Sequence, residues 1–188
     1  MAYFLSKGIN CTPHGGGTLC VLHCGQATVL KDPLDELWLS GRFDAIQVEA
    51  GHEKAKLEHL VELGLAESSD EARALALYRI LTNCVICPAK PKIIRSLLNR
   101  NERRIYHWIC KAGLRLTTAE LVFLFDRDIK PRPQLLGSEN RQTLIEVVYT
   151  TETIYDGMLE SKMEQAAMCD VVINAILGLL HKRRIILM

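Results

Sequence analysis

The predicted fold rests mainly on residues 101–125, NERRIYHWICKAGLRLTTAELVFLF. Apolar side chains recur there at helical spacing as far as Lys111, and Gly113 follows as a stop signal. The Thr-Thr pair at 117–118 is a capping signal for a second helix over residues 119–125. The segment therefore predicts a helix, a turn and a capped second helix. The first helix is predicted to begin at Pro91 or Asn101 and to run through Lys111, and its expected inner face comprises Ile94, Leu97, Leu98, Ile105, Trp108 and Ile109.

Positive charge is concentrated around this segment. Residues 90–115 hold eight basic side chains and one acid, Glu102, in a chain whose formal net charge is +1. Basic side chains on one helix repel one another unless acids pair with them, and a phosphate backbone neutralises them. The cluster therefore predicts contact with nucleic acid; the other interpretation is that these charges keep a helix soluble. The candidate residues are Lys90, Lys92, Arg95, Arg100, Arg103, Arg104, Lys111 and Arg115.

Charge also differs between the two parts of the chain. Residues 1–70 carry a formal charge of −5, and residues 71–188 carry +6. Such asymmetry indicates a polyanion-binding part joined to a part with another role, although a merely patchy surface gives the same numbers.

Two further groups of residues are candidates for nucleic-acid contact. A helix is predicted over residues 139–149, and its first turn has side chains of the kinds that pair with bases. A helix near the C-terminus ends in three cations, a position where cations also interact favourably with the helix dipole. A solvated first turn is the alternative for the first group, and the sequence leaves open which helix reads bases. The residues are Asn140, Arg141 and Gln142 in the first group and Lys182, Arg183 and Arg184 in the second.

The N-terminal third predicts a hairpin followed by helices. Residues 19–30 read as a two-stranded hairpin. A short helix, LDELWLS, is predicted to end at Gly41, and a helix over residues 53–63 is predicted to end at Gly64. A third helix is expected to begin after a cap near Ser69.

Two prolines mark the expected domain boundary. Residues 84–91, CVICPAKP, cannot continue a helix and predict an extended linker between domains over residues 1–83 and 92–188. The second domain is expected to close with a helix and a short strand. Because residues 171–180 of that helix are apolar on nearly all sides, we expect a second copy of the chain to cover them in a homodimer.

The predicted pattern resembles known families in two places. The helix, turn and capped helix of residues 101–125 resemble the opening of a winged helix–turn–helix DNA-binding domain. The hairpin, LDELWL and KLEHLVELGLAES resemble a PqqD-like winged helix, the peptide-recognition domain found beside enzymes that modify ribosomal peptides. These resemblances imply an α+β chain, mainly α with short β hairpins, built as two winged-helix-like domains in tandem. The second domain is expected to have an insertion and a long C-terminal helix.

The seven cysteines and the motif search indicate neither a metal site nor an enzyme. An odd number of cysteines, with no export signal recognised, fits reduced thiols rather than a disulfide framework. The spacings Cys11-x-x-His14, Cys20-x-x-His23 and Cys84-x-x-Cys87 only half match those of zinc sites, so we expect core cysteines, no metal and no cofactor. The sequence contains no P-loop, dinucleotide glycine pattern, hydrolase elbow or metalloprotease motif, so no catalytic residues are predicted.

Two functions of different classes follow. The first is a DNA-binding transcriptional regulator, whose basic domain contacts the phosphates of double-stranded DNA and whose N-terminal domain dimerises or senses a signal. The alternative is a non-enzymatic module that binds a protein or peptide through the edge of the N-terminal hairpin. No apolar run reaches the roughly 20 residues that span a bilayer, so we expect no membrane partner and a cytoplasmic location.

Overall fold

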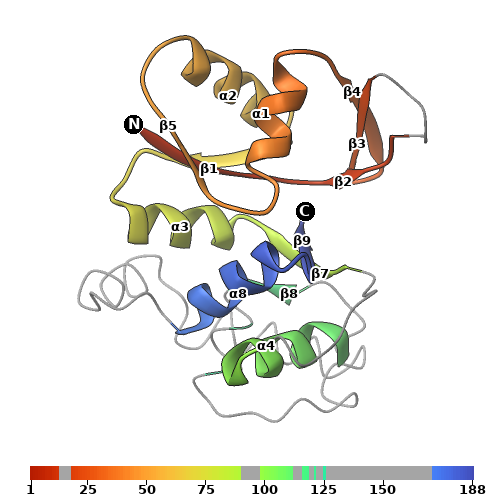
Figure 1. Ribbon diagram of the computed structural model, residues 1–188, viewed down its shortest axis with the longest axis vertical. Helices are drawn as coiled ribbons and strands as arrows, with labels where there is room; N and C mark the ends of the chain where they lie inside the picture. The colour runs from red at the N-terminus through yellow and green to blue at the C-terminus, as the bar shows by residue number, and fades with distance from the viewer. Residues whose placement is uncertain (13–17, 90–97, 112–115, 119–120, 122–124, 126–170) are drawn as a thin grey trace, which may run out of the picture. The chain divides into compact units, whose positions relative to one another are not determined.

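The chain divides into two compact units. The computed structural model describes residues 1–12, 18–89, 98–111, 116–118, 121, 125 and 171–188. The first unit comprises Met1–Cys84 with Ile186–Met188, and the second comprises Val85–Ile185. Figure 1 shows the elements of each unit along the chain, and each unit is described by itself.

The first unit contains a three-stranded antiparallel sheet in the order β5-β1-β6. Its central strand, β1 (Ala2–Ser6), pairs with β5 (Ile46–Val48) and with β6 (Ala66–Ser69). Phe4 and its neighbour Leu5 are both fully buried, so both faces of β1 are covered. No strand is predicted here from the sequence, because a strand buried on both faces lacks the alternation of apolar and polar residues.

A second sheet contains the predicted hairpin. Strands β3 (Leu19–His23) and β4 (Gln26–Leu30) are antiparallel, and β2 (Ile9–Asn10) pairs with the other edge of β3. The turn residues Cys24 and Gly25 have φ angles of 48° and 86°. Two positive φ angles are typical of the type I′ turn, whose twist matches that of the flanking strands. The hairpin prediction is confirmed.

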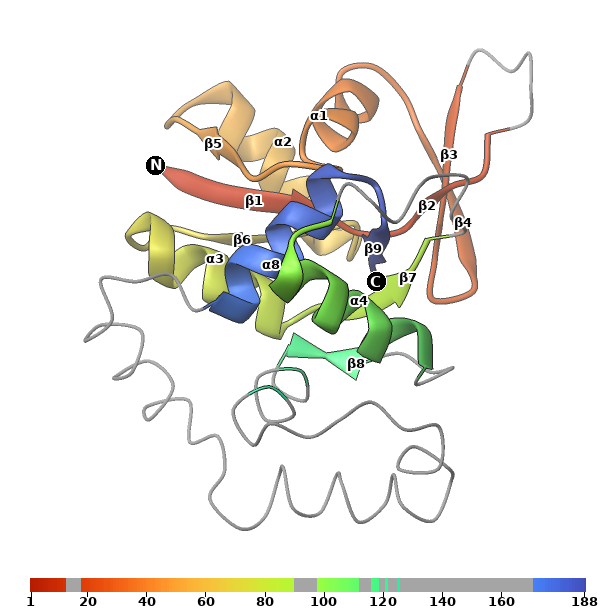
Figure 2. The ribbon, with the colours of Figure 1, turned by 60° about the horizontal axis from the view of Figure 1, so that its bottom comes forward.

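Three helices cover the sheet β5-β1-β6. They are α1 (Leu34–Ser40), α2 (His52–Glu62) and α3 (Arg73–Thr82). Figures 1 and 2 both show α1 and α2 on one side of β1 and α3 on the other, which is why both faces of that strand are buried. The three helices predicted in this part of the sequence are confirmed.

The end of α2 has the predicted glycine stop. Gly64 has a φ of 70°, and its N–H donates to the Val61 carbonyl at 2.8 Å. The next N–H, that of Leu65, donates to the Leu60 carbonyl at 2.9 Å. These two bonds form a Schellman motif, in which a left-handed residue satisfies the last carbonyls of a helix.

The core of the first unit is organised around Trp38. This side chain is fully buried, and its Nε1 donates to the Lys7 carbonyl at 3.0 Å. The ammonium group of Lys7 lies 2.8 Å from a carboxylate oxygen of Glu67, so the largely buried cation has a partner. Burial, and next the nearby Lys7 charge, lower the pKa of His23. The neutral imidazole is therefore favoured in this environment.

The described residues of the second unit include two helices and two paired strands. The helices are α4 (Arg100–Lys111) and α8 (Val171–His181). Strands β7 (Val85–Pro88) and β8 (Leu116–Thr117) are antiparallel, and β9 (Ile185–Leu187) begins at the last residue of this unit. Residues 85–88, which fall in the predicted linker, are thus a sheet strand. They are extended, as the two prolines predict.

Helices α4 and α8 pack against each other through apolar faces. On α4 the predicted inner residues Ile105, Trp108 and Ile109 are all buried. On α8 the buried residues are Val172, Ile173, Ala175, Ile176, Leu179 and Leu180. Except for Val171, which is 36% exposed, the large apolar side chains that led us to expect a homodimer are buried or partly buried within one chain, so covering them requires no second copy.

The fold class predicted from the sequence is wrong. The described residues form an α+β arrangement with three separate three-stranded sheets rather than two winged-helix-like domains in tandem. The decisive difference is β1, because it makes residues 46–48 and 66–69 partners in a sheet that the expected domain does not contain. The predicted insertion and the helix over residues 139–149 lie outside the described residues. Within the described part of the chain, no helix is long and apolar enough to cross a membrane.

Candidate nucleic-acid interface

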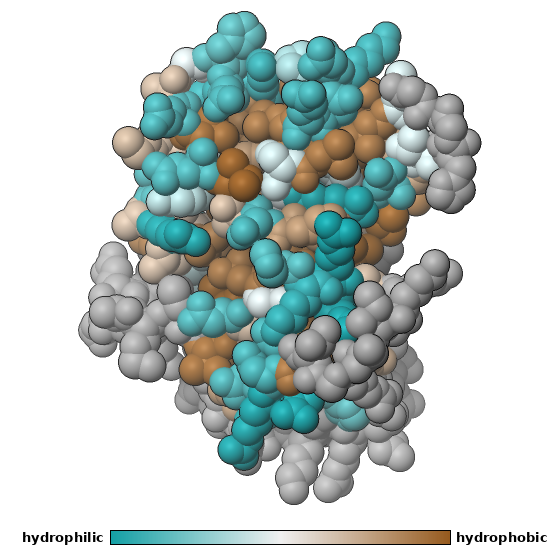
Figure 3. Space-filling model, in the orientation of Figure 1, coloured by the Kyte–Doolittle hydropathy of each residue, from teal (hydrophilic) through white to brown (hydrophobic). Residues whose placement is uncertain are grey.

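Helix α4 has one apolar face and one basic face. Its outward side chains include Arg100, Arg103 and His107, all exposed and spaced three and four residues apart, which places them in one row along the helix. The only acid in the α4 sequence, Glu102, is just 4% exposed. Figure 3 shows hydrophilic residues gathered over this helix. The outward face of α4 therefore carries cations and no anion of its own.

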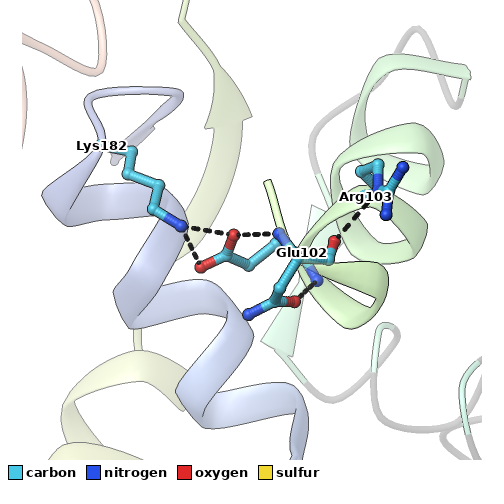
Figure 4. Close-up of polar contacts among 4 residues, drawn as sticks. Glu102, Arg103 and Lys182 are labelled. Atoms are coloured by element: carbon cyan, nitrogen blue, oxygen red, sulfur yellow. Dashed lines mark hydrogen bonds and ion pairs between the residues drawn. The ribbon is translucent and has the colours of Figure 1, made fainter. Parts of the chain in front are cut away.

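Two sets of bonds hold Glu102 inward. The Asn99 N–H donates to its Oε2 at 2.8 Å, and the Glu102 N–H donates to Asn99 Oδ1 at 2.8 Å. This reciprocal pair is a capping box at the start of α4. The Lys182 ammonium donates to both carboxylate oxygens, at 2.7 and 2.6 Å, as Figure 4 shows. The carboxylate is thus neutralised away from the surface.

Sequence reasoning missed Asn99, although a signal was present. Asparagine followed three residues later by glutamate is the sequence signature of a capping box. Gly178 of α8 is a second missed contributor: a Cβ added there would collide with Glu102 Oε1. The close approach of the two helices at the carboxylate therefore depends on that glycine.

The Glu102–Lys182 bond brings together two groups of candidates that are far apart in sequence. Its partners are separated by 80 positions. It holds the C-terminal end of α8, with Lys182, Arg183 and Arg184, beside the N-terminal turn of α4, with Arg100 and Arg103. The basic residues of both ends therefore belong to one region of the second unit.

The three cations after α8 have different surroundings. Lys182 pairs with Glu102, and Arg184 is buried, with only 5% of the residue exposed. Arg183 is exposed and has a φ of 55°. Its N–H donates to the Leu180 carbonyl and that of Arg184 to the Leu179 carbonyl, both at 2.8 Å. This is the same Schellman motif as in α2, with arginine where glycine usually stands.

The remaining described cations of α4 also differ from one another. The Arg104 guanidinium lies 4.5 Å from the centre of the Phe125 ring, a cation–π contact that fixes a partly buried side chain. Arg103 Nε donates to the Asn99 carbonyl at 3.4 Å, which orients the side chain along the helix. Among the residues that the structure describes, neither Arg100 nor Arg103 forms an ion pair with an acid. These two are the most available cations of the helix.

Several predicted residues lie outside what the structure describes. The backbone of Lys111 ends α4, but its side chain is not among those described. The predicted phosphate-binding and base-reading residues outside the described ranges are Lys90, Lys92, Arg95, Arg115, Asn140, Arg141 and Gln142.

The cysteines are only partly core residues. Cys84 is buried and donates to the Ile80 carbonyl at 3.1 Å, and burial raises the pKa of its thiol to about 12. Cys110, expected on the apolar face of its helix, is exposed instead, because it lies on the outward side of α4. Cys11 and Cys24 are also exposed, so the expectation of core cysteines is wrong for these three residues. Among the described residues, no group of three or more metal-ligating side chains is present.

No family model, curated protein or solved structure matches this chain.

Proposed function

We propose that this protein is a transcriptional regulator that binds double-stranded DNA through the outward face of α4. The observation that supports the proposal is the placement of charge on this helix. Its single acid is buried and paired with Lys182, while Arg100 and Arg103 are exposed without an acidic partner among the described residues. Because the Glu102 carboxylate caps the start of α4 and binds Lys182, the outward face of the helix has no acid of its own to offset the arginines.

The dimensions of the basic face suit a phosphate backbone. From Arg100 to His107 the helix rises about 10 Å at 1.5 Å per residue. Over that length of the duplex axis, one DNA strand carries about three phosphates, at one per 3.4 Å. Arginine binds phosphate with a planar, bidentate guanidinium, and Arg183 adds a further exposed guanidinium at the adjoining end of α8. These cations are expected to give sequence-independent affinity, and base readout is left to other residues.

Fluorescence anisotropy of labelled duplex DNA, titrated with the full-length protein across a salt series, tests this function. Phosphate neutralisation predicts saturable binding whose log affinity falls linearly with log salt, by about 0.9 for each phosphate contacted. The absence of binding at low salt would contradict the proposal. Light scattering on the same samples tests the homodimer, which stays a prediction; two copies would present two basic faces to a two-fold site.

One observation favours the alternative, a protein- or peptide-binding module. Strand β4 is an edge of the sheet β2-β3-β4, and Val29 on it is 57% exposed. An edge strand can accept an added strand from a peptide through backbone hydrogen bonds. If the full-length protein repeatedly recovers one protein partner and binds no duplex at low salt, this function replaces the first. Replacing Val29 with proline should then abolish recovery, since proline removes a backbone donor from the edge.

A further inference from the structure

Two cysteine thiols lie in direct contact on the sheet β2-β3-β4. Cys11 follows β2, and its N–H donates to the Cys20 carbonyl on β3 at 2.8 Å, which continues the pairing of the two strands. The two thiols are hydrogen-bonded to each other, with their Sγ atoms 2.9 Å apart. Cys11 is exposed and Cys20 is half-buried, so reagents in solution can reach the pair.

The backbone around the pair is fixed by further hydrogen bonds. The Cys20 N–H donates to Thr12 Oγ1 at 2.9 Å, and the Thr12 N–H donates to Asn10 Oδ1 at 2.9 Å. The two cysteines are therefore held opposite each other by the chain on both sides of Cys11.

This geometry suits a disulfide between neighbouring strands. Residues directly opposite each other in an antiparallel pair have Cα atoms about 4.5–5.5 Å apart, within the range that a disulfide spans. An S–S bond is about 2.05 Å long, so the two sulfur atoms must close by only about 0.9 Å from their present separation. The hydrogen bond that joins the two thiols, and next burial, raise the pKa of Cys20. The protonated form of the Cys20 thiol is therefore favoured in the reduced pair.

We propose that Cys11 and Cys20 form a thiol–disulfide exchange site for low-molecular-weight disulfides of the glutathione type. The Cys11 thiolate attacks one sulfur of the disulfide RSSR, forming a mixed disulfide and releasing the first thiol, RSH. The Cys20 thiol then loses its proton and attacks Cys11 Sγ, which breaks the mixed disulfide and releases the second RSH. The protein loses two hydrogens and is oxidised to one internal disulfide, while RSSR is reduced to two thiols.

Other cysteines of the chain serve as internal comparisons. Cys24 is exposed, and its Sγ lies 3.6 Å from His23 Nε2 rather than beside a thiol. Cys110 is exposed on α4. Each is expected to stop at the mixed disulfide. Cys84 is buried with a pKa of about 12, so it is expected not to react in the folded protein.

The test uses the full-length reduced protein, incubated with graded ratios of oxidised to reduced glutathione, then alkylated, digested and analysed by peptide mass spectrometry. We expect a linked pair of peptides containing Cys11 and Cys20, lighter by two hydrogens. The Cys11–Cys20 disulfide should be half-formed at a lower ratio of oxidised to reduced glutathione than the ratio at which half of Cys24 carries a glutathione adduct. In the variants Cys11→Ser and Cys20→Ser, the cysteine that remains of the pair should accumulate as a mixed disulfide with glutathione.

Two outcomes would overturn the proposal. In one, Cys11 and Cys20 of the wild-type protein accumulate separate glutathione adducts, or both stay alkylatable, at ratios that modify Cys24. In the other, either cysteine links preferentially to a different cysteine or to a second molecule. Circular dichroism confirms that each serine variant is folded, and the Cys24→Ser variant, which should still form the Cys11–Cys20 link, is the matched control.

Discussion

Helices α2 and α4 are both surface helices with one buried face, but their acidic residues are exposed on α2 and buried on α4. On α2 the acids Glu53, Glu58 and Glu62 are exposed among basic residues, and the helix has ion pairs at the surface, such as Lys54–Asp70 at 3.3 Å. On α4 the one acid is buried and every described charged side chain on the outward face is basic. A surface helix of this chain can therefore have a face on which acidic and basic residues are balanced, and α4 differs from that arrangement.

The largest loss of stability is expected from a substitution that removes the bonds holding Glu102 inward. Replacing Glu102 with alanine removes the capping box and leaves the Lys182 ammonium without its carboxylate. Losing one partner of a buried pair costs about 3–5 kcal/mol, and because the Lys182 side chain is 35% exposed we expect about 2–3 kcal/mol. The free energy of unfolding, measured by urea denaturation, tests this.

The matched control is on α2. Glu62→Ala removes an exposed acid whose carboxylate lies 3.5 Å from His59 Nδ1, and the free energy of unfolding should change by less than about 0.5 kcal/mol. Equal small changes in the free energy of unfolding for Glu102→Ala and Glu62→Ala would mean that the bonds of Glu102 contribute no more to stability than those of an exposed acid.

A smaller loss is expected at the contact between α4 and α8. In Gly178→Ala, the new methyl group collides with Glu102 Oε1 and must displace the carboxylate or separate the helices. Overpacking of this kind costs about 1–3 kcal/mol, and the better helix propensity of alanine returns up to about 1 kcal/mol. We therefore expect a net loss of about 1–2 kcal/mol in urea denaturation. A stabilised variant would show that the approach of the two helices is not tight.

The smallest effects on stability are expected from substitutions at the C-terminal ends of α2 and α8. Both helices end in a Schellman motif, with Gly64 in one and Arg183 in the other. A left-handed conformation costs a residue with a Cβ about 1–2 kcal/mol, so Gly64→Ala should destabilise and Arg183→Gly should stabilise by about 1 kcal/mol. If Arg183 contacts phosphate, the more stable glycine variant should bind DNA more weakly. Thermal unfolding and anisotropy on the same samples measure both.

Local signals in the sequence predicted the helices and the hairpin, whereas contacts between distant residues were missed. Gly41 and Gly64 end their helices as predicted, because capping depends on neighbouring residues. Strand β1 was missed, since it pairs with residues more than 40 positions away and has no alternation to reveal it. Without β1, the hairpin and helices were assigned to a winged helix.

The sequence shows that basic residues are concentrated at the candidate site, but it does not show which of them are exposed, buried or paired. The excess of basic residues between positions 90 and 115 is visible in the sequence, and Arg100 and Arg103 are exposed as contact with DNA requires. That Glu102 is buried against Lys182, and that Arg184 is buried while Arg183 is exposed, depend on how α8 packs on α4. Such packing involves residues 80 positions apart, and no local pattern records it.

The salt dependence of duplex DNA binding, measured for two matched double variants, tests whether the outward face of α4 binds DNA. Arg100→Gln/Arg103→Gln removes two cations from α4, and Lys54→Gln/Lys56→Gln removes two from α2. If the outward face of α4 contacts phosphates, the slope of log affinity against log salt should become shallower by about 1.8 in the first variant and stay unchanged in the second. Equal slopes for the wild-type protein and the α4 variant, or the same change in both variants, would contradict the account.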